Sequence, residues 1–522
     1  MHQSLNKAIE AATEKKDLSA GPDEPKIRVN EALSKAAFAY EKLRQAIDYQ
    51  DEHLFLKNAI KRILKRTTVF RPQDSERIAS NLMHELVWAR YFDNDYLPSA
   101  LTEEVASILR KFHFIRQSVK SKESANKVND IVLGLIACDI ETFLSPAEDK
   151  KHFLDFSREI ISKNIEIGEA EINLQKLSSQ IEISIEKLLF KSDLDQIRFS
   201  LIKKSYKYWP DINQDEAKEF AVRFDEIVPI VDLEASQVHK SPVFKYIKRN
   251  IPPFLVLWDM IKQSKSAATR HLKDEQSLKE RASSIVSAKN KNIFGRVARG
   301  LVRGIIFILL TKTIFAFLIE LPYEARILND VNYRSLIINI CAPPVLMLVT
   351  GFFVRIPGRK NTQELVRVLE RIVFQNELTA KKLTTLKPAR SGSYIIFNAA
   401  YTLLSLAILS LVVWGLAALK FSVVSIVLFF FFVSLVSFLA FRIRSTAREL
   451  EVKAAEEGLV TGVFSFLLLP FVVVGKLLSD KWSQYNFTLF FWDFIIEAPF
   501  KTIIGVFESW LLFVREKRED FE

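Results

Sequence analysis

The chain has 522 residues, of which 49% are hydrophobic and 26% charged, and its formal net charge is +11. This apolar content excludes a wholly disordered chain. The two cysteines, Cys138 and Cys341, are too few for a disulfide framework or a cysteine-based metal site.

Charge and apolarity divide the chain near residue 297. The first part is densely charged but nearly balanced between acidic and basic residues, whereas the second is dominated by long apolar runs. A balanced surface is not typical of a nucleic-acid-binding protein, so no nucleic-acid partner is expected.

The N-terminal half is predicted to be helical. Residues 1–25, which contain Gly21-Pro22, are expected to form a mobile tail. Residues 26–264 are predicted to form an all-α cytoplasmic domain, because only four glycines precede residue 297 and a turn-rich β fold needs more. Residues 265–297, polar almost all round, are expected to form a helical stalk or linker into the membrane.

Apolar residues recur in steps of three and four between Ile167 and Leu188. This spacing predicts a long helix in a hairpin or a coiled-coil-like contact. Because Ile181, Ile183 and Ile185 alternate with polar residues, a strand is the alternative for this segment.

Residues 298–514 are predicted to form a multi-pass transmembrane domain. A membrane-spanning helix needs about 20 mostly apolar residues, and several runs reach that length with few charges. The expected spans are about 304–321, 335–354, 395–419, 421–441, 458–478 and 487–510, followed by a tail over 515–522. The last run is less clean, so residues 487–514 could instead lie on the membrane surface as an amphipathic helix.

The basic residues predict the orientation of these spans. Lys and Arg are frequent before the first span and after the second, fourth and last, and scarce in the alternate loops. Since cytoplasmic loops carry the excess of Lys and Arg, we expect six spans in the cell or inner membrane, with both termini in the cytoplasm. Five spans and an interfacial last segment are the alternative.

No residue pattern typical of a catalytic, cofactor-binding or metal site is present. His84-Glu85 begins like a metalloprotease helix, but Trp88 stands where the second His is required. Glycine-rich phosphate loops and nucleophile elbows are also missing. We therefore expect no enzymatic activity, no catalytic residues, no cofactor and no metal.

Ionisable residues within the predicted spans are the candidate functional residues. Lys312 lies midway along the first run, where a charge costs about 2.5–3.5 kcal/mol and should face protein or water. Asp493, Glu497 and Lys501, four residues apart, share one face of the last run. Three interpretations are open: a static ion pair of Lys312 with Asp493 or Glu497, a polar path through the membrane, or a surface helix whose carboxylates lie in water.

Two Gly-x-x-x-Gly patterns are candidate helix-packing sites, since small residues one turn apart let helices approach closely. They are Gly300 with Gly304 and Gly458 with Gly462.

The basic loop after the second span adds a candidate lipid contact. Residues 361–385 could form an amphipathic helix whose cations favour anionic lipid headgroups, although an ordinary positive-inside loop is the favoured explanation of this charge. The function expected from the sequence is a non-catalytic membrane scaffold, sensor or assembly component that binds the bilayer and an unidentified protein partner. A homo-oligomer is open, and the alternative function is a channel or secondary transporter with a polar path through Lys312, Asp493 and Glu497.

Overall fold

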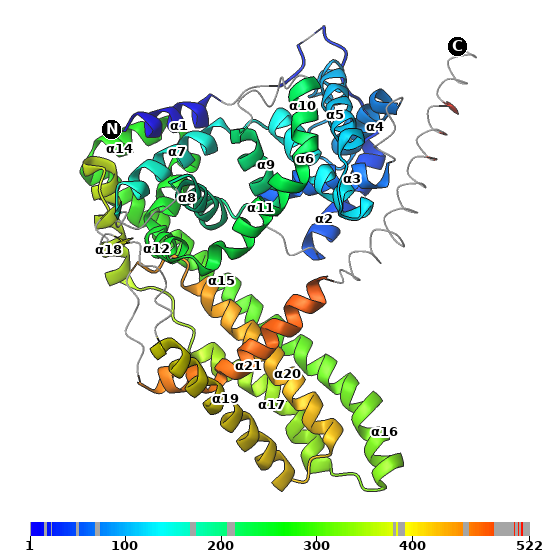
Figure 1. Ribbon diagram of the computed structural model, residues 1–522, viewed down its shortest axis with the longest axis vertical. Helices are drawn as coiled ribbons and strands as arrows, with labels where there is room; N and C mark the ends of the chain where they lie inside the picture. Colours follow the sequence, from blue (N-terminus) through cyan, green and yellow to red (C-terminus); the bar gives the residue numbers. More distant parts are fainter. Residues whose placement is uncertain are drawn as a thin grey trace. The chain divides into compact units, whose positions relative to one another are not determined.

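The computed structural model describes residues 2–14, 18–21, 23–47, 52–67, 74–166, 174–205, 214–378, 383–384, 392–452 and 459–484, with single residues beyond. Within these residues the fold is all-α apart from the two-residue strands β1 (Ile165–Glu166) and β2 (Leu383–Thr384) (Figure 1). It divides into two compact units, Met1–Ile251 with Ser264–Thr269 and Pro252–Gln263 with Arg270–Asn486.

The first of these, the N-terminal unit, consists of helices joined by short connections. Its helices are α1 (Gln3–Thr13), α2 (Glu31–Ile47), η1 (Glu52–Leu54), α3 (Phe55–Arg66), α4 (Ser75–Trp88), α5 (Leu101–Ser118), α6 (Ala125–Leu144), α7 (Glu148–Ser162), α8 (Leu174–Leu189), α9 (Leu194–Ser205), α10 (Gln214–Val222), α11 (Phe224–Gln237), η4 (Val238–Lys240) and α12 (Pro242–Asn250).

Helix α6 lies in the core of this unit. Its stretch from Ile131 to Ile140 is apolar almost all round and buried, as expected of a helix without a polar face. Helices α3, α5 and α9 pack around it. The Ser124 side chain caps its first turn by accepting the Lys127 N–H at 3.4 Å.

The sequence makes specific predictions for two segments of the N-terminal unit, the first 25 residues and the stretch between Ile167 and Leu188. Residues 3–13, part of the expected mobile tail, form α1, whose Leu5 and Ala8 are fully buried against α7. In the segment between Ile167 and Leu188, the described residues are helical as α8, with Ile183 and Ile185 both buried. This helix is covered on several sides, which is why its isoleucines need not follow a single helical stripe.

The second unit, the C-terminal unit, carries the long apolar helices. Its helices are α13 (Pro252–Ser264), most of α14 (Ala268–Lys273), α15 (Glu275–Phe315), the π-helical turn η6 (Ala316–Glu320), α16 (Leu321–Tyr323), the π-helical turn η7 (Glu324–Leu328), α17 (Tyr333–Phe352), α18 (Arg359–Glu370), the π-helical turn η8 (Arg371–Gln375), α19 (Gly392–Ala418), α20 (Val423–Ala447) and α21 (Leu459–Gln484). The short helix η5 (Lys265–Ala267), between α13 and α14, belongs to the N-terminal unit.

Five of these helical stretches are long and apolar enough to cross a membrane. They are Glu275–Leu328, Tyr333–Phe352, Ile395–Ala418, Val423–Ala447 and Gly462–Ser479. They coincide with the first five expected spans. The sixth expected span, 487–510, lies almost entirely outside the described residues.

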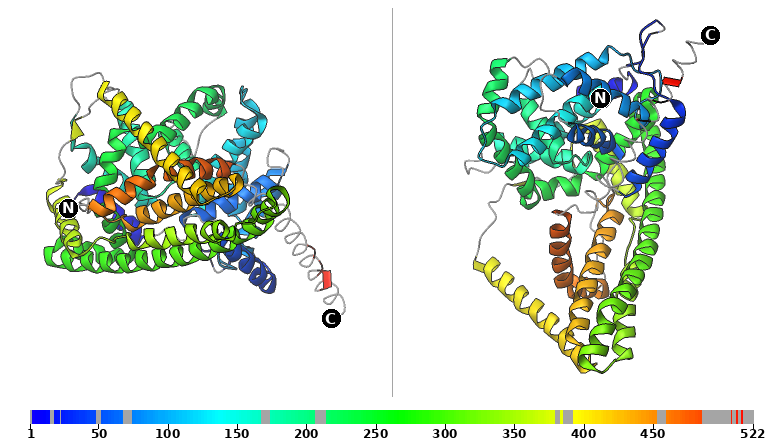
Figure 2. Two further views of the ribbon diagram at one scale, coloured as in Figure 1. Left: turned by 90° about the horizontal axis from the view of Figure 1, so that it is seen from below. Right: turned by 90° about the vertical axis from the view of Figure 1, so that its right-hand side faces the viewer.

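The first of these stretches is a single helix of 54 residues, from Glu275 to Leu328, about 80 Å long at 1.5 Å per residue. Figure 2 draws it as an uninterrupted ribbon. Its first part is the expected stalk, and there Leu278, Ile285 and Ile293 form a buried stripe. Helix α18 packs on α15 through its own buried face, which includes Leu365 and Leu369.

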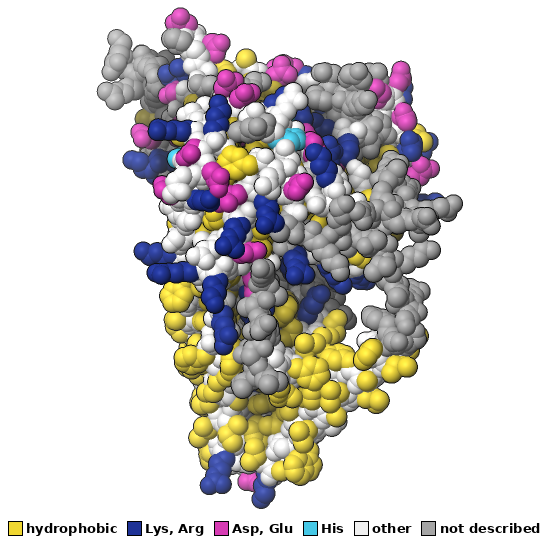
Figure 3. Space-filling model, turned by 90° about the vertical axis from the view of Figure 1, so that its left-hand side faces the viewer, with side chains coloured by type: hydrophobic (Ala, Val, Ile, Leu, Met, Phe, Trp, Pro, Cys, Tyr) yellow, Lys and Arg dark blue, Asp and Glu magenta, His cyan; other side chains and the backbone are white. Residues whose placement is uncertain are grey.

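Apolar side chains cover the outside of the long helices (Figure 3). None of the most apolar window of α19 is buried, and only 39% of that of α20 is. A surface of this kind is normal in lipid and excessive in water. The buried side of the bundle is small and centres on Ile308, Met347 and Phe432.

Close helix contacts in the bundle depend on glycine. A Cβ at Gly304 would lie 2.3 Å from Met347 Cε, and one at Gly475 would lie 2.1 Å from the carbonyl oxygen of Ser434 on α20. At Gly300 the nearest atom is 3.9 Å away, and at Gly462 nothing lies within 4 Å. Gly458 lies outside the described residues. The backbones of α20 and α21 therefore meet at Gly475, a position outside both Gly-x-x-x-Gly patterns.

We predict that Gly475→Ala destabilises the purified full chain in detergent by about 1–3 kcal/mol, because α20 and α21 must separate to admit the methyl group. Gly462→Ala should be neutral or slightly stabilising, because no atom lies within 4 Å of the added Cβ and alanine favours the helix. Thermal unfolding followed by circular dichroism would measure both. Equal effects of the two substitutions would contradict the close contact at Gly475.

Candidate functional site

Five polar side chains gather among the candidate membrane spans of the C-terminal unit. They are Lys312, Glu320, Glu324, Asn339 and Ser425, which we call the intramembrane polar cluster, and each is at most 2% exposed. Three separate stretches of chain supply them: the 54-residue helix, α17 and α20. Burying polar groups here is costly unless they satisfy one another.

Lys312 and Glu320 form the ionic core of the cluster. Lys312 Nζ lies 2.5 Å from Glu320 Oε1 and 5.0 Å from the centre of the Phe432 ring. In a regular α-helix, residues eight apart point in directions that differ by about 80°, because two turns take about 7.2 residues. The π-helical turn Ala316–Glu320 takes about one residue more than an α-turn, and so brings Glu320 onto the face of Lys312.

Asn339 ties Glu320 to the neighbouring helices. Its Nδ2 donates to Glu320 Oε1 at 2.8 Å and to the carbonyl oxygen of Ser425 at 3.0 Å. One amide therefore joins α17 to both the π-helical turn and α20, and both hydrogens of that amide are used.

Glu324 forms the end of the cluster next to the interhelical loops. Its Oε1 accepts the Ser425 hydroxyl at 3.1 Å, and its Oε2 accepts the Asn332 N–H at 3.2 Å. The Asn332 amide in turn donates to the carbonyl oxygens of Leu419 and Lys420, both at 3.3 Å. The cluster thus continues from the buried interior to the loops that end the helices.

Two buried atoms of the cluster lack partners among the described residues. They are Glu320 Oε2 and Asn339 Oδ1. Both are acceptors, and they belong to the two side chains that already share a hydrogen bond.

The structure places the sequence-predicted residues as follows. Lys312 faces protein inside the bundle, and its contact there is Glu320. Asp493, Glu497 and Lys501 lie outside the described residues, so pairing between them and Lys312 stays a prediction. Sequence reasoning missed Glu320, which lies inside the expected span 304–321, and Glu324, which lies beyond its end. The signal available was the helical spacing of four between these two glutamates, at the end of a run that already held Lys312.

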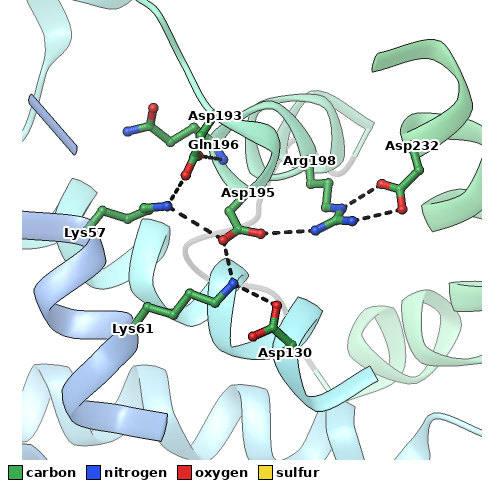
Figure 4. Close-up of polar contacts among 8 residues, drawn as sticks. All are labelled: Lys57, Lys61, Asp130, Asp193, Asp195, Gln196, Arg198 and Asp232. Carbon is green, nitrogen blue, oxygen red and sulfur yellow. Dashed lines mark hydrogen bonds and ion pairs between the residues drawn. The ribbon is translucent and has the colours of Figure 1, made fainter. Parts of the chain in front are cut away.

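The N-terminal unit contains a second concentration of charge (Figure 4). Lys57 and Lys61 on α3 meet Asp195 at 3.6 and 2.7 Å, and Lys57 also pairs with Asp193. Lys57 is only 1% exposed. The outer members are Asp130, 3.0 Å from Lys61 Nζ, Arg198, 3.1 Å from Asp195, and Asp232, 2.7 Å from Arg198.

This ionic network is held tightly against the core. A Cβ at Gly134 would lie 2.4 Å from Asp195 Cγ, so only glycine on α6 lets the carboxylate reach both lysines. The described charges in it are all matched by opposite charges at short range. The network therefore joins α3, α6, α9 and α11 by ion pairs and does not form an open binding site.

The pKa values in the network follow from its charges. Burial acts to raise the pKa of Asp195, but attraction to Lys61 and Lys57 outweighs it, and the pKa lies below its usual value. Burial acts to lower the pKa of Lys61, and the charges of Asp195 and Asp130 overcome it, so that pKa is raised. Both groups are therefore charged throughout the neutral range.

The described residues include no group of three or more His, Cys, Asp or Glu side chains arranged to hold a metal ion. Comparisons of the chain with protein-family models, with curated proteins and with solved structures found no match.

We predict that Asp195→Asn destabilises the N-terminal unit by about 3–5 kcal/mol at neutral pH, because it leaves the buried Lys57 and Lys61 with less opposing charge. A carboxylate whose folded pKa is depressed stabilises above its unfolded pKa, about 3.9, and loses that contribution as the pH falls through the folded value. The difference between the two proteins should therefore shrink between about pH 5 and pH 2. Amide hydrogen exchange in α6 and α9 of the full chain would measure it.

Asp95→Asn is the matched control, since Asp95 pairs with Arg28 at the surface, where the side chains are 43% and 78% exposed. An exposed pair contributes at most about 1 kcal/mol. If the loss of stability in Asp195→Asn did not change with pH, the charge of Asp195 would not be what stabilises the ionic network.

Proposed function

We propose that the chain is a multi-pass integral membrane protein of the cell or inner membrane, whose N-terminal unit works in the cytoplasm as a non-catalytic scaffold or sensor. The observation that carries this proposal is the continuous helix Glu275–Leu328. Its first part packs against α18, and its last part holds Lys312, Glu320 and Glu324 of the polar cluster. A rearrangement at either end of one rigid helix shifts the other, as a membrane sensor requires.

The charge distribution supports a cytoplasmic location for the stalk end. The described cations at that end of the apolar helices are Arg296, Arg299, Arg303, Arg355, Arg359, Lys360, Arg442, Arg444 and Arg448. At the opposite end the corresponding cations are Arg326, Arg334 and Lys420. The richer end is the cytoplasmic one by the positive-inside rule.

Two surfaces support binding partners. On α11, Ile230 and Leu233 lie three residues apart and are 58% and 55% exposed, a stripe suited to a protein partner. On α18 the apolar face is buried in protein, which leaves Arg359 and Lys360 exposed toward anionic lipid headgroups.

The second candidate function is a channel or secondary transporter with a polar path that includes Lys312, Asp493 and Glu497. The polar cluster favours it, because intramembrane ionisable groups often mark such paths. The close contact of Lys312 with Glu320 of its own helix weakens it, since this contact leaves the lysine less free to serve a moving ion.

The sensor proposal predicts that Lys312→Met in the full chain, reconstituted in lipid nanodiscs, speeds amide exchange in the stalk residues 278–293 by about tenfold, equivalent to about 1.4 kcal/mol of local opening. The reason is that loss of the ammonium group should reshape the π-helical turn and tilt the helix Glu275–Leu328. Mass-spectrometric hydrogen exchange would measure it.

Two control variants test whether the helix carries the effect. In a Gly300→Pro background, where the helix is interrupted, Lys312→Met should no longer alter stalk exchange. Trp414→Ala on α19, whose side chain is 70% exposed, should leave the stalk unchanged in either background. An unaltered stalk in Lys312→Met alone would refute the coupling.

The proposed orientation predicts opposite labelling of single cysteines in intact cells, with Cys341 replaced by Ala. Ile327→Cys and Ala418→Cys, at the cation-poor end, should react with an impermeant maleimide added outside. Gln375→Cys, at the end of η8, should react only after the membrane is permeabilised. Reversed labelling would place the N-terminal unit outside the cytoplasm.

A further inference from the structure

Three arginine side chains lie on one side of the helices α15 and α20, at the end where their apolar surface begins. They are Arg299 and Arg303 on α15 and Arg442 on α20, which we call the arginine face, and all three are exposed. Within the described residues, no carboxylate or other side chain pairs with their guanidinium groups. Unpaired cations that lie together attract an anion from outside the chain.

Helices α15 and α20 are antiparallel neighbours at the level of the arginine face. A Cβ at Gly300 would lie 3.9 Å from Ile443 Cδ1. One at Gly304 would lie 3.3 Å from Leu439 Cδ2. The meeting positions thus rise in number along α15 and fall along α20. Since the axes of packed helices are about 8–10 Å apart, arginines that point to the same side of both helices reach the same ligand.

The helical turn directs Arg299 and Arg442 to the same side. In an antiparallel pair of right-handed helices, the residues that directly precede two meeting positions point to one common side of the pair. Arg299 precedes Gly300, and Arg442 precedes Ile443. Arg303 follows Arg299 by four residues and so shares its face of α15. The three guanidinium groups therefore flank one region beside the helix pair.

The face of Arg303 continues along α15 as an exposed apolar stripe. Leu310, Ile314 and Phe317 follow Arg303 by seven, eleven and fourteen residues, which keeps them on its face, and all three are exposed. A phospholipid has the same order of groups, with an anionic headgroup above its acyl chains. Arginine also suits a phosphate group better than lysine does, because guanidinium donates two parallel hydrogen bonds to phosphate oxygens.

The acidic residues at the end of α20 do not neutralise the arginine face. Among the described residues, Glu449 lies 3.8 Å from Arg296 and Glu451 lies 3.6 Å from Arg448, so these carboxylates pair with other cations. An acidic protein segment is a less suitable occupant than a lipid. It would leave the apolar stripe below the arginines uncovered, whereas a phospholipid covers both parts of the surface.

We propose that the arginine face is the binding site for one anionic phospholipid of the cytoplasmic leaflet. The phosphate oxygens accept hydrogen bonds from the guanidinium groups, and an acyl chain lies along the stripe of Leu310, Ile314 and Phe317. This inference rests on the proposed membrane location of the chain, and it adds a lipid class and a site. The site is distinct from the headgroup contact of α18, whose cations belong to a different helix.

Native mass spectrometry of the purified full chain tests the site, with phosphatidylglycerol or phosphatidylcholine added to the detergent micelles. The tightest-bound lipid should be a single phosphatidylglycerol. Combining Arg303→Gln with Arg442→Gln should weaken its binding about 25-fold, about fivefold for each cation lost. The matched control combines Arg326→Gln with Arg334→Gln, two exposed arginines at the opposite end, and should leave the affinity unchanged. None of these four side chains pairs with another within the described residues, so both variants should fold.

An equal loss of affinity in the two double variants, or equal binding of the two lipids by the wild type, would overturn the site. Displacement of phosphatidylglycerol by free glycerol phosphate at equal concentration would overturn it in favour of a soluble phosphate ligand. The membrane location is tested separately, by alkaline carbonate washing of phosphatidylcholine vesicles that carry the wild type. Loss of the chain from these vesicles would refute the proposed function, whereas retention without lipid selectivity would refute this site alone.

Discussion

The contact between Lys312 and Glu320 depends on a constraint that water-soluble proteins do not face. Within hydrocarbon, no solvent can complete the hydrogen bonds of a buried group, so each polar atom needs a partner supplied by the chain. Lys312 obtains its partner from its own helix, at the price of a π-helical turn that departs from the favoured α-helical geometry. Pro322 follows that turn and has no N–H to extend the α-helical pattern. The local irregularity of the first span is therefore a consequence of where its charges must meet.

The two buried charge groups of the molecule solve the same electrostatic problem differently. In the N-terminal unit, Asp195 is surrounded by three cations, and each outer cation has a further carboxylate, so the network closes on itself. Among the candidate membrane spans, Lys312 and Glu320 have one contact each of opposite charge, the Asn339 amide donates to Glu320, and the Ser425 hydroxyl donates to Glu324. The first arrangement is rigid because every charge is matched. The second is held by one ion pair and by the hydrogen bonds of Asn339 and Ser425.

How far the sequence predicts this structure depends on the range of each interaction. The long apolar runs predict the first five candidate spans, because span length depends only on local composition and bilayer thickness. The isolated charge of Lys312 predicts burial within protein, since its cost in lipid is a property of the residue itself. Glu320 is not predictable as its direct partner, because residues eight apart differ in direction by about 80° in a regular α-helix and it is the π-helical turn that aligns them. Gly475 and Ser479 form a small-x-x-x-small pattern, but the sequence does not predict the contact of Gly475, because the contacting atom is a backbone oxygen of a different helix.

The helix from Glu275 to Leu328 gives these separate features a common mechanical basis. Its stalk is fixed on one side by the buried faces of Leu278, Ile285 and α18, while its far end is fixed by Asn339 and Ser425. Between them the outer surface of the helix is apolar and exposed, so lipid restrains it only weakly. A helix that is packed against protein at both ends and exposed between them can transmit a rotation or a tilt from one end to the other. The polar cluster is the attachment that contains charges, so the proposed sensor function requires that a change of charge there reaches the stalk.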